Sequence, residues 1–131
     1  MKIVYMSLTG NVRDFVEETG LDSYELLSDA PPIEMKEDYI IVIPTYVGYI
    51  NEDVERFVEY GNNLDHLVGF AGSGNLNFGD DLFCINAREL SAKYNKPLIM
   101  TFEYFGTPYD VIKFRKEVER LEGTRTTKEN A

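Results

Sequence analysis

The stretch Ser7-Leu8-Thr9-Gly10-Asn11-Val12 has the residue types of an anion-binding turn. It follows the short apolar run Ile3-Val4-Tyr5-Met6 and precedes an amphipathic run that begins at Val12. A strand, a tight turn and a helix in this order direct the free N–H groups of the helix start, and the positive end of its dipole, into the turn. The turn has no Lys or Arg, so it is neither a nucleotide P-loop nor a GxGxxG motif. A phosphate here would be held by neutral donors; an ordinary capped helix start is the alternative interpretation.

Two further loops carry aromatic rings and glycines. Residues 44–51 offer Tyr46 and Tyr49 as ring faces, with Gly48 where a backbone could approach a ligand. Residues 72–79 offer glycines, exposed backbone donors and the ring of Phe78. These rings could also pack on the edge of a sheet without touching a ligand.

The elements that position these loops follow from the apolar pattern. Strands are expected at residues 2–6, 23–27, 39–43, 67–71 and 97–103. Helices are expected over 12–19, around Val54, Phe57 and Val58, over 80–94, and from the capping sequence Thr107-Pro108-Tyr109-Asp110 to about 121, with 28–38 as a surface connection.

This alternation predicts an α/β fold: a doubly wound parallel sheet of five strands in the order 2-1-3-4-5, with helices on both faces. The three loops follow strands one, three and four, so they should meet at the carboxyl edge of the sheet, where such folds bind ligands. One phosphate seat and aromatic faces suit FMN better than ATP or NAD. We expect a single domain over residues 1–122 and a polar tail over 123–131.

Composition excludes several classes of function. The net charge of −10 argues against nucleic acid and anionic membranes as partners. One cysteine and one histidine allow no internal disulfide, zinc motif, histidine metal cluster or Ser/His/Asp triad. Cys84 is interpreted as a core residue inside the third helix. No apolar run is long enough for a signal peptide or a membrane span, so the cytoplasm is the expected compartment.

The turn at 7–12 resembles the FMN phosphate loop of flavodoxin-like proteins. Two other stretches resemble the narrower NrdI family, the small flavodoxin-like activators of class Ib ribonucleotide reductase: Ala71-Gly72-Ser73-Gly74-Asn75 with Phe78-Gly79-Asp80, and Phe102-Glu103 with Gly106-Thr107 and Asp110-Val111. The resemblance extends from about residue 2 to residue 121.

Membership of this family implies an FMN cofactor that, once reduced by an electron donor, reacts with O₂ to give superoxide. The implied partner is the small subunit of the class Ib reductase, in which the oxidant generates a dimanganese–tyrosyl radical cofactor. The metal then belongs to the partner, and this chain is a redox accessory protein with no catalytic side chain of its own.

The resemblance also implies the cofactor-binding residues. The phosphate would be held by Ser7, Thr9, Gly10, Asn11 and Val12, with Leu8 in the same turn. The isoalloxazine would be lined by Thr45, Tyr46, Gly48 and Tyr49, with a backbone group of Gly48 near flavin N5. Ser73, Gly74 and Asn75 would contact the pyrimidine edge, and Phe78, beside Gly79, would stack on the ring where family members often carry Trp.

Two other functions remain open at this stage. A flavodoxin-type one-electron carrier would use the same cofactor, although the 72–79 loop lacks the acidic, aromatic character usual in flavodoxins. A doubly wound binding or signalling module would use no flavin. A receiver domain would need an acidic cluster after strand one and an Asp after strand three, where this chain has Ser-Leu-Thr-Gly and Pro-Thr-Tyr.

Overall fold

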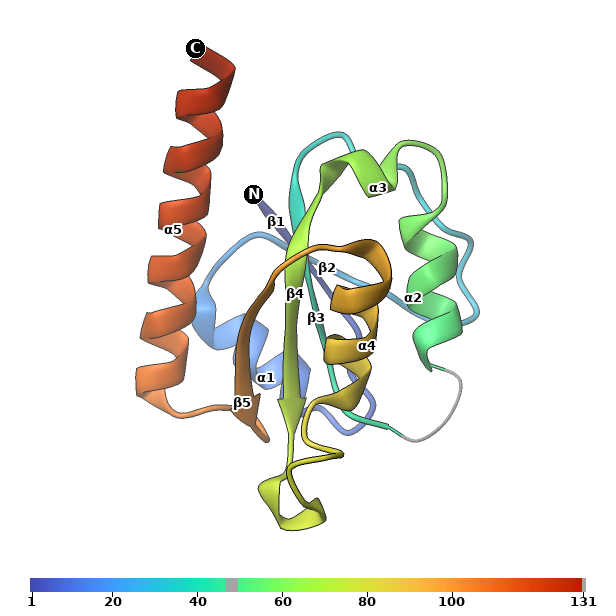
Figure 1. Cartoon of the computed structure of the whole chain (residues 1–131), viewed down its shortest axis with the longest axis vertical. Helices are drawn as coiled ribbons and strands as arrows, with labels where there is room; N and C mark the ends of the chain where they lie inside the picture. The colour runs from blue at the N-terminus through green and yellow to red at the C-terminus, as the bar shows by residue number, and fades with distance from the viewer. Residues whose placement is uncertain (47–49, 131) are drawn as a thin grey trace.

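The sheet of this protein has five parallel strands in the order β2-β1-β3-β4-β5, as the sequence predicts (Figure 1). The computed structural model describes residues 1–46 and 50–130, with side chains described as far as residue 124. The strands are β1 Lys2–Tyr5, β2 Ser23–Glu25, β3 Tyr39–Ile43, β4 Leu67–Gly74 and β5 Leu98–Glu103. β3 is the central strand, and all five of its residues are buried.

Helices cover both faces of the sheet (Figure 1). They are α1 Asn11–Thr19, α2 Ile50–Val58, α3 Asn63–His66, α4 Ile85–Tyr94 and α5 Pro108–Asn130, and a 3₁₀ turn, η1, spans Leu76–Phe78. Alternate residues of β3 enter two separate cores: Ile40 and Val42 pack with α1 and α5, whereas Ile41 and Ile43 pack with α2 and α4. This alternation explains why the strand reads as one continuous apolar run.

The expected start of the last helix is confirmed in atomic detail. The N–H of Thr107 donates to Oδ2 of Asp110 at 2.9 Å, and the N–H of Asp110 donates to Oγ1 of Thr107 at 3.1 Å. This reciprocal capping box fixes the start of α5 directly after β5. The helix continues to Asn130, through the residues expected to form a polar tail.

Several expected boundaries were wrong: β2 ends at Glu25 and not at Leu27, and α2 begins at Ile50, inside the expected loop of residues 44–51. Two further differences lie at the site. β4 extends to Gly74 and not to Ala71, because Ser73 and Gly74 pair with Phe102 and Glu103 of β5. α4 begins at Ile85, so Cys84 lies at its N-cap with φ 53° and not inside the helix. Glycine allows this arrangement: a Cβ on Gly74 would lie 3.0 Å from the backbone N of Cys84. The start of α4 therefore sits directly against the end of β4.

Within the described residues, no helix combines the length and apolar character needed to cross a lipid bilayer.

Candidate functional site

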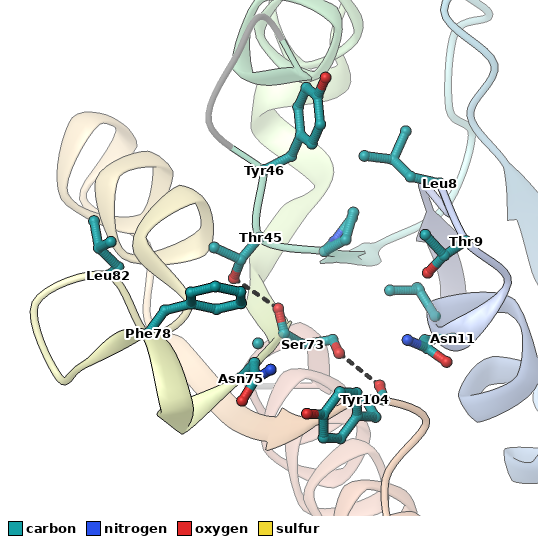
Figure 2. A pocket seen from close by; sticks show the side chains of 13 residues that line it. Leu8, Thr9, Asn11, Thr45, Tyr46, Ser73, Asn75, Phe78, Leu82 and Tyr104 are labelled. Atoms are coloured by element: carbon teal, nitrogen blue, oxygen red, sulfur yellow. Dashed lines mark hydrogen bonds between the residues drawn. The ribbon is translucent and has the colours of Figure 1, made fainter.

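A cavity of about 360 Å³ opens at the carboxyl edge of the sheet, where the three loops meet (Figure 2). Its walls contain many of the residues expected from the sequence: Leu8, Thr9, Asn11, Val12, Thr45, Tyr46, Ser73, Gly74, Asn75 and Phe78. Pro44, Leu82 and Tyr104 also line it, and the sequence interpretation missed all three. Ser7, Gly10 and Gly79 do not line the cavity, while Gly48 and Tyr49 lie outside the described residues.

Ser7 and Gly10 stabilise the conformation of the first turn, residues 7–12, through hydrogen bonds and backbone geometry. Oγ of Ser7 accepts hydrogen bonds from the N–H groups of Gly10 and Arg13, each at 3.2 Å. Gly10 has φ 95°, a left-handed conformation that favours glycine, and its carbonyl accepts the first helical bond of α1. The N–H groups of Asn11 and Val12 have no acceptor among the described residues. They remain available as donors at the positive end of α1.

The positive charge in the first turn of α1 is already neutralised. Nε and Nη2 of Arg13 each lie 2.9 Å from a carboxylate oxygen of Glu25, and the hydroxyl of Tyr5 donates to the same carboxylate at 3.1 Å. The Arg13 guanidinium holds the pKa of Glu25 below its ordinary value. None of the described residues that line the cavity is charged. An anion at this turn would therefore meet neutral donors.

Three segments of the cavity wall are joined by hydrogen bonds (Figure 2). Oγ1 of Thr45 donates to the carbonyl of Ser73 at 2.7 Å, and Oγ of Ser73 donates to the carbonyl of Tyr104 at 2.5 Å. The N–H of Tyr104 donates to the carbonyl of Gly74 at 3.2 Å. These bonds tie the segments that follow β3 and β5 to the end of β4.

Tyr104 has an unusual backbone for a residue with a side chain. Its φ is 52°, in the left-handed region, which costs energy that the surrounding bonds must offset. With this backbone conformation, Tyr104 forms part of the cavity wall. One signal could have found Tyr104: it directly follows β5, and the carboxyl ends of all parallel strands share one edge.

Large rings around the cavity are exposed to solvent. The exposed fraction is 53% for Tyr46, 71% for Phe78 and 45% for Tyr104. Tyr46 projects from the segment after β3, and Phe78 and Tyr104 lie on the other side of the hollow (Figure 2). Exposed aromatic rings grouped around a hollow are typical of a ligand site, because a bound planar group covers their apolar faces.

The loop that carries Phe78 is shaped by hydrogen bonds outside the cavity. Oδ1 of Asn75 caps η1 by accepting from the N–H of Asn77 at 2.9 Å, and the N–H of Leu76 donates to Oε2 of Glu103 at 3.3 Å. Gly79 ends the 3₁₀ turn with φ 91°. Asn75, which also lines the cavity, and Gly79 thus fix the shape of the loop.

The single thiol of the chain, that of Cys84, is buried and unreactive. Sγ of Cys84 donates to the carbonyl of Gly72 at 3.3 Å, and burial raises the pKa of the thiol to about 11. Across residues 1–46 and 50–130, no group of three or more His, Cys, Asp or Glu residues is arranged to hold a metal ion. The cavity offers hydrogen-bond donors and aromatic surface, and is therefore suited to binding a ligand.

The strand order and the position of the cavity define the class: this is a flavodoxin-like protein. The crystal structure of oxidised Flavodoxin 2 from Bacillus cereus has the same fold, with a TM-score of 0.62 over 91% of this chain and 97% of that one, at 17% sequence identity. A narrower match comes from the model of the family described as "NrdI Flavodoxin like", which covers residues 3–116. The chain belongs to the NrdI flavodoxin-like family.

Proposed function

We propose that this protein binds FMN in the cavity and, once its flavin is reduced, supplies superoxide to the small subunit of a class Ib ribonucleotide reductase. There the oxidant would serve the assembly of a dimanganese–tyrosyl radical cofactor. Membership of the NrdI family supports the proposal. The observation that carries it is the cavity itself, in which unpaired neutral donors and exposed aromatic rings face one hollow at the switch point of the sheet.

The residues present fit FMN. The cavity volume lies within the range of pockets for ligands of this size. The N–H groups of Asn11 and Val12 and the side chains of Thr9 and Asn11 would hold the phosphate. Tyr46 and Phe78 would cover the isoalloxazine.

The remaining expected residues take supporting positions in this proposal. Ser7, Gly10 and Gly79 would shape the turns that hold the cofactor. Ser73, Gly74 and Asn75 would lie along the pyrimidine edge, beside Thr45. Gly48 and Tyr49 are proposed to line the same ring.

Bound FMN would supply the electron transfer, from a reducing partner to O₂. The protein would bind and orient the flavin, and its charge would influence how readily the flavin takes up electrons. Its uncharged cavity wall and its net charge of −10 disfavour additional negative charge in the site. The exposed rings at the rim would leave the site accessible to the electron donor and to the small subunit.

Binding is tested by titrating the purified protein with FMN and with riboflavin, which lacks the phosphate. We expect flavin absorption bands that persist through gel filtration, and tighter binding of FMN. Changing Thr9 and Asn11 together to Ala should weaken FMN binding by about 1–3 kcal/mol and leave riboflavin binding unchanged. A folded protein that remains colourless with both flavins would refute the proposal.

Activation is tested by mixing the reduced protein with the manganese-loaded small subunit and O₂. The tyrosyl radical should form, as measured by electron paramagnetic resonance, and superoxide dismutase should reduce its yield if the oxidant is exposed during transfer. An FMN-binding protein that forms no complex with the small subunit and reacts slowly with O₂ would instead be a one-electron carrier.

A further inference from the structure

One buried side chain bonds both to Tyr46, which follows β3, and to Asn51, in the first turn of α2. Asn86, in the first turn of α4, is 4% exposed. Its Oδ1 accepts from the N–H of Tyr46 at 2.8 Å, and its Nδ2 donates to the carbonyl of Tyr46 at 3.1 Å. The same Nδ2 donates to Oδ1 of Asn51 at 2.9 Å. The side chain thus pairs with both backbone groups of Tyr46, as a neighbouring strand would.

Packing alone does not explain an Asn at position 86, because an apolar residue would fill a buried helix position at lower cost. A buried amide is unfavourable unless its polar atoms are bonded, and Asn is a weak helix former. Here the amide oxygen and both amide hydrogens have partners that lie outside α4. A further bond, from Nδ2 of Asn51 to Oε2 of Glu89 at 3.1 Å, links the first turn of α2 to α4. α4 therefore supports Tyr46 and the first turn of α2.

Asn86 does not itself line the cavity, whereas Tyr46 does. We propose that Asn86 is a positioning residue, which holds Tyr46 in place as the wall for the flavin ring and so reduces the ordering that flavin binding would otherwise require. This inference rests on the proposed FMN site. In this proposal Asn86 affects binding of the flavin ring through Tyr46, whereas Thr9 and Asn11 hold the phosphate.

The test uses two substitutions in the full chain. Asn86→Asp keeps the shape and the acceptor for the N–H of Tyr46, but places an oxygen against the carbonyl of Tyr46 and Oδ1 of Asn51. Asn86→Ala removes all three bonds. For either variant we expect the dissociation constants of FMN and riboflavin to rise by the same factor, about 10-fold or more. Amide hydrogen exchange at Tyr46, measured by NMR without flavin, should become faster in Asn86→Ala, which removes the acceptor of this N–H.

The matched control is Asn63→Ala. Asn63 is also a buried amide with three bonds, to the N–H of Met35 at 2.6 Å and to the carbonyls of Ile33 and Phe57 at 2.9 and 2.7 Å. It lies in α3, at the edge of the sheet opposite the cavity (Figure 1). This variant should lower stability and leave flavin affinity in the folded protein, and exchange at Tyr46, unchanged.

Each outcome decides the inference. Wild-type affinity for both flavins in folded Asn86→Asp, or a loss confined to FMN, would overturn it. If Asn86→Ala does not fold, Asn86→Asp and Asn51→Ala still decide, the latter with a smaller expected rise of about 3-fold. If the wild-type protein binds neither flavin, the proposed function fails, and exchange at Tyr46 then decides alone: an unchanged rate in Asn86→Ala, or in Asn86→Leu if the Ala variant does not fold, would show that Asn86 does not position Tyr46.

Discussion

The hydroxyl of Ser73 donates to the carbonyl of Tyr104 at 2.5 Å, and so joins the end of β4 to the residue that follows β5. The bond helps to offset the energetic cost of the left-handed backbone of Tyr104, whose φ is 52°. The carbonyl of Ser73 in turn accepts from Thr45. Ser73 therefore links Thr45 and Tyr104, and all three residues line the cavity.

Substituting Ser73 by Ala should lower the free energy of unfolding by about 1–3 kcal/mol, because the carbonyl of Tyr104 loses a donor in a half-buried site. FMN binding should weaken as well. Urea denaturation and flavin titration measure the two effects. Ser91→Ala is the control, since Oγ of Ser91 donates to the carbonyl of Lys96 at the same distance, 2.5 Å, far from the cavity. It should cost stability and leave flavin binding unchanged; equal flavin affinity in both variants would contradict the prediction.

A methyl group on Gly72 should be poorly tolerated. Its Cβ would lie 2.8 Å from Cβ of Ala87 and 3.2 Å from Cβ of Cys84, so α4 would have to move away from β4. We expect Gly72→Ala to lower the free energy of unfolding by about 1–3 kcal/mol. Gly123→Ala, where a Cβ meets no atom within 4 Å, should raise it by up to about 1 kcal/mol through helix propensity. Thermal or urea unfolding of the two variants gives the comparison.

The thiol of Cys84 should resist labelling in the folded protein. Its pKa of about 11 leaves little thiolate at pH 8, and the side chain is buried. A disulfide reagent should therefore react at a rate that follows unfolding, and quickly once urea is added. Rapid labelling of the native protein at pH 8 would show that the start of α4 opens locally.

The ion pair between Arg13 and Glu25 predicts a pH dependence of stability. The pKa of Glu25 is lowered in the folded state from its ordinary value of 4.5, chiefly by the hydrogen bond from Arg13. A lowered pKa stabilises the fold above the unfolded value, and this contribution is lost as the pH falls through the folded value. The stability difference between the wild type and Glu25→Gln should be constant from pH 7 to about 5 and should shrink below about 4.5. Urea denaturation across this range measures it; a difference independent of pH would exclude the linkage.

Much of the fold follows from local patterns in the sequence. Tyr39–Ile43 reads as a central strand because its five residues are consecutive and apolar, and the structure buries all five. The Thr107–Asp110 pair marks a helix start because its bonds lie within four residues. The 2-1-3-4-5 order then follows from the alternation of elements and the handedness of their connections.

The remaining features depend on contacts between distant residues. Gly72-Ser73-Gly74 has no apolar alternation, so its pairing with β5 is invisible until β5 lies beside it. The left-handed backbone of Cys84 arises from packing against the same strand. Asn86 bonds to residues 35 and 40 positions away, and no local signal marks it. Tyr104 enters the cavity through a backbone conformation that its residue type does not favour.

The direction of α5 has a practical consequence. The helix starts beside the last strand's carboxyl end and runs back to the opposite edge of the sheet, where the chain also enters β1 (Figure 1). Both described ends of the chain therefore point away from the cavity. An affinity tag, a fluorescent dye or a link to a sensor surface can be attached at either end, and the mouth of the cavity should stay open to flavins and to a docking protein.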